Sequence, residues 1–374
     1  MKACEVFLRE RLKLDRPGMI HFGLTSADVN NLAYGLLLTR FRDEQQLPQL
    51  RRLIAKLADL VDAWKAAVFP ARTHGQTASP TTLGKEFAVF LSRLFRQAQQ
   101  IEAHKFRGKL TGATGTHAAA HAAFPDWDWI EFGIDFVVSL GLEPNTCTTQ
   151  IEDHDTLAEY FAMVGRVNSM VRDLDEDVWT YISHGDLIER VVDREVGSST
   201  MPHKVNPIRF ENGEGNAAIS NALLAALSDK LTRSRMQHDL SDSTVKRNIG
   251  VALAHSILAI GQTLGGLDRI GVNESALVAK VAAAPEALAE AYQSILRTTD
   301  VEDPYELLRR LTRGEAISLD RLHALVEDLP VDSEVKNRLR ALRPTEYVGL
   351  APAICERVLS DVRAWLDRAP HGEP

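Results

Sequence analysis

Cysteine is scarce in this sequence, and its scarcity excludes several classes of protein. Only Cys4, Cys147 and Cys355 occur in 374 residues, and no two of them form a Cys-x-x-Cys pair. An odd number of isolated cysteines argues against a disulfide framework and against a cysteine-rich structural zinc site. Unpaired thiols are typical of a reducing compartment, so we expect a cytoplasmic protein.

An excess of positive charge and long apolar runs are also missing. Lys and Arg number 43 against 51 Asp and Glu, which gives a net charge of −8 at pH 7. Because the sequence has no basic tail or cluster, we expect no nucleic-acid partner. No uninterrupted apolar run reaches the roughly 18 residues that a membrane span needs, and the N-terminus has no signal-peptide core. We therefore expect no membrane partner.

Sustained period-two alternation is absent as well, whereas helical periodicity is abundant. Residues 157–182 carry apolar side chains at three- and four-residue steps, which predicts one apolar stripe on a very long helix. Residues 50–64, 83–106, 208–231 and 244–267 show the same pattern. Long striped helices bury their stripes against one another, so we predict an all-α fold built on a long-helix bundle.

The helical pattern is interrupted at residues 269–273, where Asn273 is suited to cap a following helix. We place a domain boundary at this interruption. The expected parts are a short N-terminal helical segment at 1–23, a central long-helix bundle at 24–268, and a C-terminal helical domain at 269–374 that ends in a disordered tail.

The densest group of polar chemistry lies at Gly197–Pro207, which reads Gly-Ser-Ser-Thr-Met-Pro-His-Lys-Val-Asn-Pro. Gly197 frees the backbone at one end, and the two prolines stiffen the rest. Hydroxyl, imidazole, ammonium and amide groups follow one another here, a set that suits a ligand rich in carboxylate and phosphate. The alternative is an ordinary surface loop between two helices.

The same stretch resembles the signature loop of the fumarase/aspartase superfamily, and its Met-Pro-His-Lys form resembles the bacterial adenylosuccinate lyases. Four further segments resemble blocks of that family, in the expected order: 21–28, 72–80, 148–152 and 239–248. The resemblance implies an enzyme that releases fumarate from a small nucleotide substrate, without metal or cofactor. It also implies a homotetramer whose active sites are shared between subunits.

The implied reaction is a β-elimination, which needs a base for a carbon-bound proton and an acid for the leaving nitrogen. The resemblance assigns the base to Ser198. Backbone amides and Lys204 would stabilise the alkoxide form of this serine. From the residues alone, the favoured interpretation of Ser198 is a turn or helix cap, and only the resemblance reverses it. His74 is the expected acid, because imidazole titrates near neutrality. Its alternative is a histidine bonded within a turn.

Further residues are expected to bind the substrate through short hydroxyls, amides and positive charge. Ser243 and Arg247 lie four residues apart, on one face of an expected helix, and suit a phosphate. The alternative for this pair is a solvated surface patch. The expected binding set is Thr25, Ser26, Gln150, Ser199, Lys204, Val205, Asn206, Asn212, His238, Ser243 and Arg247.

The sequence departs from the family pattern in two places. The resemblance would place an arginine where His238 stands, and a neutral imidazole lacks the fixed charge of a guanidinium. Either phosphate binding is weaker than in the family, or a neighbour such as Arg233 or Arg235 compensates. The family also carries an N-terminal region with an Arg-Tyr pair and an Asn-His-Asp motif, neither of which this sequence contains. We therefore interpret 1–23 as the remnant of that domain and expect impaired turnover.

Two histidine patterns resemble metal sites. His117 and His121 are four residues apart, but no third ligand lies nearby. Asp153–Asp155 opens the long helix, where acidic residues are favoured by the helix dipole alone. We expect no metal at either place. The alternative functions are another fumarate-releasing lyase or cycloisomerase of the superfamily, or a truncated, non-catalytic helical assembly protein.

Overall fold

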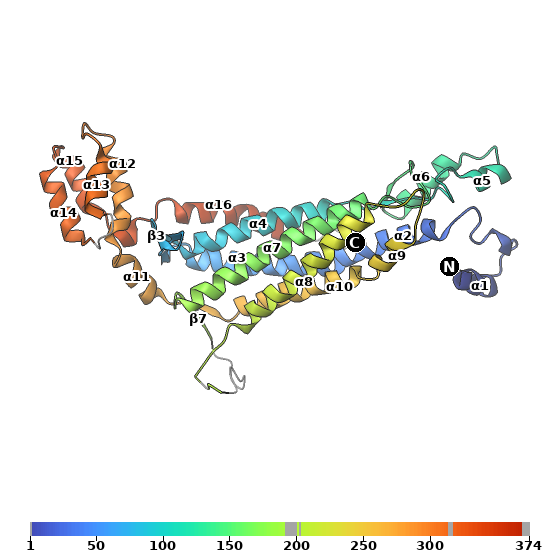
Figure 1. Cartoon of the computed structure of the whole chain (residues 1–374), viewed down its shortest axis with the longest axis horizontal. Coiled ribbons are helices and arrows are strands. Elements are labelled where there is room, and N and C mark those ends of the chain that lie inside the picture. The colour runs from blue at the N-terminus through green and yellow to red at the C-terminus, as the bar shows by residue number, and fades with distance from the viewer. Residues whose placement is uncertain (1, 191–199, 202, 313–316, 369–374) are drawn as a thin grey trace.

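Long helices dominate the computed structural model of the chain, which describes residues 2–190, 200–201, 203–312 and 317–368. The all-α prediction is confirmed (Figure 1). The expected tail at 369–374 lies outside the described residues. Five helices form the central bundle: α3 (Leu47–Trp64), α4 (Leu83–Ala103), α7 (Asp155–Ser183), α8 (Ile208–Leu231) and α10 (Ile249–Leu267).

The apolar stripe predicted for the longest helix lies in the hydrophobic core of the bundle. Along α7 the buried positions include Val164, Val167, Val171 and Leu174, each with no exposed surface. Burying one such side chain stabilises the fold by about 1.5–3 kcal/mol. The stripe packs against α8, α10 and α4, so α7 contacts three of the other four helices of the bundle.

Two predicted helix boundaries are wrong. The helix expected at 83–106 ends at Ala103, because His104 turns into extended backbone at ψ 138°. The helix expected at 244–267 is two helices, α9 (Ser241–Lys246) and α10, separated at Arg247 and Asn248. Asn248 donates its backbone N–H to the Val245 carbonyl, three residues back, and this tighter turn ends α9.

Within the described residues, one stretch is apolar and long enough to cross a membrane. It runs from Ser241 to Leu267 and has a mean hydropathy of 1.4 over 18 residues, half of which are buried inside the structure. Ala252, Ala259 and Ile260 lie on the buried side and pack within the bundle. The composition of this stretch is therefore also that of a core helix.

Short two-stranded ribbons fix the loops between the helices. Three are antiparallel, and β5–β6 is parallel. Among the described residues, each ribbon has two strands and none extends into a wider sheet. The pairs are β1 (Val68–Phe69) with β4 (Thr81–Thr82), β2 (Arg72–Thr73) with β3 (Gln76–Thr77), β5 (Arg107–Gly108) with β6 (Glu143–Pro144), and β7 (Leu187–Glu189) with β8 (Ile270–Val272).

Smaller helices occupy the two ends of the bundle. One end carries α1 (Lys2–Arg11), η1 (Pro17–Met19), α2 (Ser26–Phe41), the π-helical turn η2 (Arg42–Gln46), α5 (Ala118–Ala123) and α6 (Trp129–Ser139) (Figure 1). The other end carries α11 (Glu274–Ala282), η3 (Pro285–Leu288), α12 (Ala289–Leu296), α13 (Pro304–Thr312), α14 (Leu319–Asp328), α15 (Ser333–Ala341) and η4 (Pro344–Glu346).

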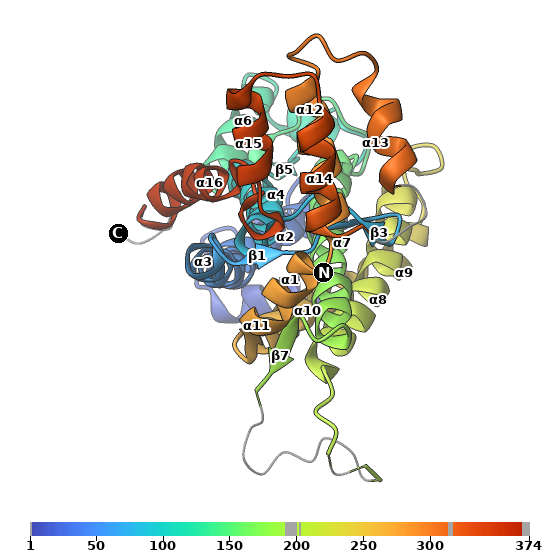
Figure 2. The same cartoon turned by 90° about the vertical axis from the view of Figure 1, so that its left-hand side faces the viewer.

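The C-terminal helices have a hydrophobic cluster of their own, around Leu288, Tyr292 and Leu322. Figure 2 views the molecule from this end, with α12, α14 and α15 in front of the long helices. The last helix, α16 (Ala351–Leu366), leaves this cluster and packs on α3 and α4, where Trp365 is buried.

Candidate active site

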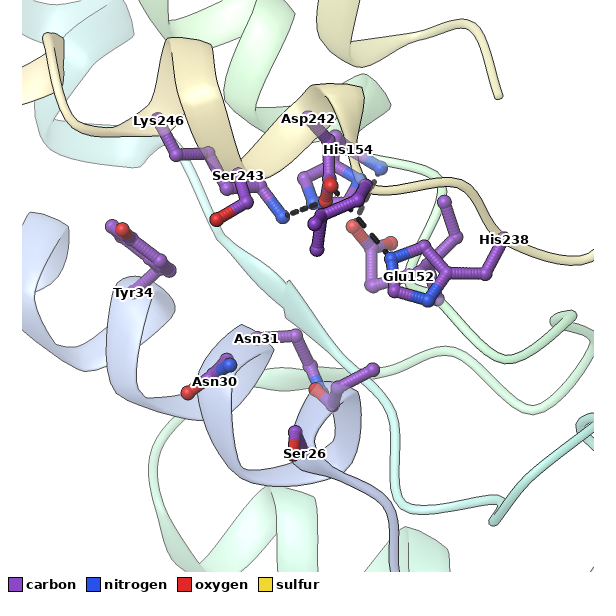
Figure 3. Close-up of a pocket in the computed structure, with 13 residues that line it drawn as sticks. Ser26, Asn30, Asn31, Tyr34, Glu152, His154, His238, Asp242, Ser243 and Lys246 are labelled. Atoms are coloured by element: carbon purple, nitrogen blue, oxygen red, sulfur yellow. Dashed lines mark hydrogen bonds and ion pairs between the residues drawn. The ribbon is translucent and has the colours of Figure 1, made fainter. Parts of the chain in front are cut away.

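A cavity of about 230 Å³ lies where α2, the segment before α7 and α9 meet (Figure 3). Three residues expected to bind substrate line it, namely Ser26, His238 and Ser243. A fourth, Gln150, reaches the cavity through its contact with His238. The lining residues are Ser26, Ala27, Asn30, Asn31, Tyr34, Ile151, Glu152, His154, His238, Leu240, Asp242, Ser243 and Lys246.

The start of α2 is set by a capping box, as its Thr-Ser-Ala-Asp sequence favours. Asp28 Oδ2 accepts hydrogen bonds from the Thr25 backbone N at 2.7 Å and from Thr25 Oγ1 at 3.0 Å. Asp28 Oδ1 accepts from the backbone N atoms of Thr111 and Gly112, both at 3.1 Å. Thr25 therefore supports the helix start rather than lining the cavity, and Ser26 is held at its rim.

A buried ion pair joins this helix start to the segment that carries Gln150. Lys109 Nζ lies 2.9 Å from Asp28 Oδ1, and both side chains are fully buried. The same ammonium donates to the carbonyls of Gly112 at 3.0 Å and Gln150 at 2.6 Å. Burial acts to raise the pKa of Asp28, but the hydrogen bonds from Thr25 and Lys109 outweigh it and leave that pKa below its ordinary value.

The side chain of Gln150 determines how His238 is protonated. Gln150 Nε2 donates to the Ala113 carbonyl at 3.1 Å, so its Oε1 is the acceptor that faces His238 Nδ1 at 2.7 Å. His238 Nδ1 must then carry the proton. Its other nitrogen, Nε2, lies 3.7 Å from Asp242 Oδ1, so a doubly protonated His238 would bridge the two acceptors.

Asp242 and Lys246 form an ion pair on the α9 side of the cavity. Lys246 Nζ donates to Asp242 Oδ2 at 2.7 Å, and each side chain is 11% exposed. The ring of Tyr34 lies below the same ammonium, with its centroid 5.8 Å away. Burial acts to raise the pKa of Asp242, but the hydrogen bond and charge of Lys246 lower it more, so the carboxylate is ionised at neutral pH.

Beside this ion pair lie two titratable groups whose burial changes their charge (Figure 3). Burial raises the pKa of Glu152 to about 7, although Asn145 and the His154 backbone N donate to its oxygens. Burial, reinforced by the charge of Lys246, lowers the pKa of His154 to about 4. His154 is therefore neutral at pH 7, and Glu152 can hold or release a proton there.

His74 lies far from this cavity. It occupies the tight turn between β2 and β3, is exposed, and has φ +53°, followed by Gly75 at φ +74°. Arg72 Nη1 donates to the Gly75 carbonyl at 3.2 Å and braces the turn. In Figure 1 this hairpin lies at the end of the bundle next to the C-terminal helices, whereas α2 and α9 lie toward the other end.

The remaining expected residues are distributed outside the cavity. Ser198 and Ser199 lie outside the described residues. Lys204 and Val205 are exposed, and Asn206 is half-buried, just before α8. Asn212 is exposed on α8, where its carbonyl groups accept from Asn216.

The arginines near α9 do not line the cavity. Arg247 is exposed at the end of α9, although its expected partner Ser243 does line it. Arg233 is paired with Asp229 at the end of α8, and Arg235 is exposed before α9. The positive charge at the cavity comes instead from Lys246.

Sequence motifs alone do not identify several of the residues that line the cavity. In the sequence, Glu152 belongs to a family block, His154 lies at the start of the long helix, and neither Asp242 nor Lys246 stands out as a binding residue. One signal was available, because His238, Asp242 and Lys246 follow one another at steps of four. That spacing places side chains on one face wherever the backbone is helical.

Comparison with known proteins gives matches along nearly the whole chain. Residues 3–219 match a family described as lyase, and residues 234–348 match one described as adenylosuccinate lyase C-terminal. The adenylosuccinate lyase of Haemophilus influenzae is 41% identical over 363 residues, which cover 96% of this chain and 80% of that protein. The adenylosuccinate lyase of Escherichia coli K12 is 43% identical over 357 residues, which cover 94% and 78%.

Solved structures with the same fold are more distant in sequence. The 3-carboxy-cis,cis-muconate lactonizing enzyme of Pseudomonas putida superposes with a TM-score of 0.77 at 21% identity, covering 97% of this chain and 82% of that one. A fumarate lyase of Mesorhizobium sp. BNC1 superposes with a TM-score of 0.76 at 20% identity, covering 95% and 82%. At such low identity these structures establish the long-helix fold alone.

Proposed function

The chain belongs to the adenylosuccinate lyase family, and on that premise we propose how its residues carry out the reaction. It is a C–N lyase of purine biosynthesis that eliminates fumarate from adenylosuccinate, giving AMP, and from the succinyl-carboxamide ribotide. The observation that carries this function is the 43% identity to an adenylosuccinate lyase over 94% of the chain. The alternatives of another superfamily lyase or a non-catalytic assembly protein have no comparable support.

We assign the base to Ser198 and the acid to His74. Removal of the Cβ proton leaves an aci-carboxylate, which needs nearby donors, and the C–N bond then breaks as the leaving nitrogen is protonated. A turn that displays His74 to solvent supports the second assignment, because the imidazole is free to meet a substrate held elsewhere. The assignment of Ser198 rests on its place in the signature sequence.

We place part of the substrate in the cavity at α2 and α9. Ser26, Ser243 and His238 offer donors there for carboxylate or phosphate oxygens, and Gln150 orients His238. The other proposed binding residues reach the substrate from elsewhere in the assembly. They are Thr25, Ser199, Lys204, Val205, Asn206, Asn212 and Arg247.

We propose that the active enzyme is a homotetramer with shared active sites. The helix α7 has 29 residues and spans about 44 Å, so one chain cannot bring His74 to the cavity at the other end of the bundle. Apolar side chains also remain exposed on α8 and α10, including Ile219 and Leu258 at 51% each. Packing copies through these helices would cover them and bring distant residues together.

The proposed compartment is the cytoplasm. The three cysteines are unpaired, and Cys4 and Cys147 are exposed. Exposed free thiols persist best where the surroundings are reducing.

Fumarate release from adenylosuccinate, followed by ultraviolet absorbance, tests the activity directly. The shared-site proposal is tested by mixing two inactive variants, Ser198→Ala and His74→Asn, under conditions that exchange subunits. If the two residues act in one site from different chains, the mixture should regain activity that neither variant has. A mixture as inactive as its components, with subunit exchange verified, would contradict the shared site.

A further inference from the structure

The cavity holds a positive charge, that of Lys246, to which the proposed reaction gives no role. Among the described residues that line the cavity, Lys246 is the only lysine or arginine. Its side chain runs from α9 across the wall toward Asp242, with Ser243 beside it and Tyr34 facing it (Figure 3). A nearly buried ammonium in a polar cavity is costly unless it has partners, so its position calls for an explanation.

We propose that Lys246 is the fixed cation that binds an anionic group of the substrate, either a phosphate or a carboxylate. This inference rests on the function proposed above, because it presumes that the cavity receives part of the substrate. It assigns the charge of this site to a side chain on α9 rather than to Arg233, Arg235 or Arg247.

The geometry supplies the donors that such a site needs. An ammonium has three N–H groups, and the Asp242 carboxylate accepts from one of them at 2.7 Å. The other donors are available to a ligand on the cavity side, where the hydroxyls of Ser26 and Ser243 also lie. A hydrogen bond from a charged donor to a charged acceptor is shorter and stronger than a neutral one.

The charges around Lys246 determine how strongly an anion can bind, because Glu152, whose pKa burial raises to about 7, adds negative charge to the cavity when it is ionised. Asp242 neutralises Lys246 in the free protein, and His154 is uncharged at pH 7 because burial lowers its pKa to about 4. His238 Nε2 lies 3.7 Å from Asp242 Oδ1, so Asp242 has a second neighbour besides Lys246. Asp242 therefore holds Lys246 in place while its own charge opposes the anion. Removing the charge of Lys246 should weaken anion binding, whereas removing the charge of Asp242 should not.

Calorimetric titration with AMP, adenosine and fumarate tests the proposal on the full chain. Lys246→Met keeps the length of the side chain and removes its charge, and it should weaken anion binding by about 10-fold or more. Weaker AMP binding with unchanged adenosine binding would identify a phosphate, whereas weaker fumarate binding would identify a carboxylate. Lys246→Arg should restore most of the affinity.

Lys56→Met is the matched control. Lys56 pairs with Asp268 at 2.8 Å on a helix outside the cavity, so its loss should leave all three affinities unchanged. Asp242→Asn distinguishes a binding role of Lys246 from a purely structural one. It removes the counter-ion of Lys246, so it should tighten anion binding or leave it unchanged. A purely structural pair would make both Lys246→Met and Asp242→Asn harmful.

Three results would overturn the proposal. They are wild-type affinities in a folded Lys246→Met, weaker anion binding in Asp242→Asn, and a wild-type chain that binds neither anion. If Lys246→Met does not fold, the direction in which Asp242→Asn changes the anion affinity decides the test. Because these measurements need no turnover, a wild type that binds AMP through Lys246 but releases no fumarate would refute the proposed function and leave this inference standing.

Discussion

At the scale of single residues, the backbone of His74 explains how a turn can present a catalytic group. Only a small share of non-glycine residues has positive φ, and such a conformation costs free energy that neighbouring structure must offset. Here the β2–β3 register pairs Thr73 with Gln76, and Arg72 closes the turn onto Gly75. The imidazole is therefore displayed at the tip of a braced hairpin.

His74→Asn should lower kcat by about 10²–10⁴ while changing KM much less. Asparagine tolerates the left-handed backbone at this position, so the turn should persist, but an amide cannot deliver a proton at neutral pH. Steady-state kinetics with circular dichroism as the fold control measures this. An unchanged kcat with a raised KM would make His74 a binding residue.

Ser198→Ala should abolish measurable turnover and leave the oligomer intact. The substitution removes one oxygen, and loss of a general base lowers rates by about 10²–10⁴. Fumarate release and light scattering on the same sample provide the two readouts. Near-normal kcat would remove Ser198 from the mechanism.

His238→Arg should tighten AMP binding. A guanidinium carries a permanent charge, and Gln150 Oε1 and Asp242 Oδ1 are placed to accept from it as they face the imidazole now. A charged hydrogen bond contributes about 1.5–3 kcal/mol, which corresponds to roughly 10-fold or more in Kd. Equal or weaker affinity would indicate that Lys246 already provides the charge the anion needs.

At the scale of helices, a buried carboxyl lies between α7 and α10. Asp175 is 1% exposed, its Oδ2 accepts from Thr263 Oγ1 at 2.9 Å, and its Oδ1 has no hydrogen-bond partner. Burial raises the pKa of Asp175 from 3.8 to about 8. The folded state therefore holds a proton that the unfolded chain releases, and its stability falls as pH rises from about 4 toward 8.

Asp175→Asn should raise the melting temperature at pH 8 and flatten its dependence on pH. The amide keeps the contact with Thr263 without any ionisation cost, which for this carboxyl is on the order of 2–5 kcal/mol at pH 8. Melting curves at pH 5 and pH 8 measure the effect. The control is Asp173→Asn, a half-exposed position on the same helix that pairs with Arg93. Equal pH dependence in both variants would contradict the assignment.

The three-part division of the chain remains a proposal at this scale. The interruption at 269–273 coincides with β8, which pairs with β7 beside the long helices. Buried side chains between Leu288 and Leu339, among them Tyr292 and Leu322, form a separate hydrophobic cluster, whereas α16 rejoins the cluster of α3 and α4. We therefore propose the C-terminal part as a helical module tied to the bundle at both of its ends.

At the scale of the whole molecule, the exposed apolar faces of α8 and α10 bear on assembly. Ile219→Glu should reduce the mass measured by light scattering and lower turnover along with it, because a charge in a dry helical interface is costly. Leu350→Glu is the control, since Leu350 is 75% exposed beyond the bundle. An assembly of unchanged size in Ile219→Glu would place the interface on other helices.

Much of the fold follows from local pattern. The stripe at 157–182 lies within α7, and 208–231 is α8 to the residue, because helical periodicity is a property of neighbouring positions. The separate α9 was not predictable in this way. The chain at 247–248 turns between two helices without glycine or proline, so neither of the two strong helix breakers marked the break.

The sequence by itself determined which short segments hold polar chemistry, and motif resemblance pointed to Ser26, Gln150, His238 and Ser243. Only the tertiary structure decided that these residues meet, since Gln150 and His238 are 88 positions apart. The same holds for Lys246, and for the altered pKa values of Glu152 and His154. Charge and protonation in a cavity depend on burial and on distant neighbours, and neither can be derived from a residue's place along the chain.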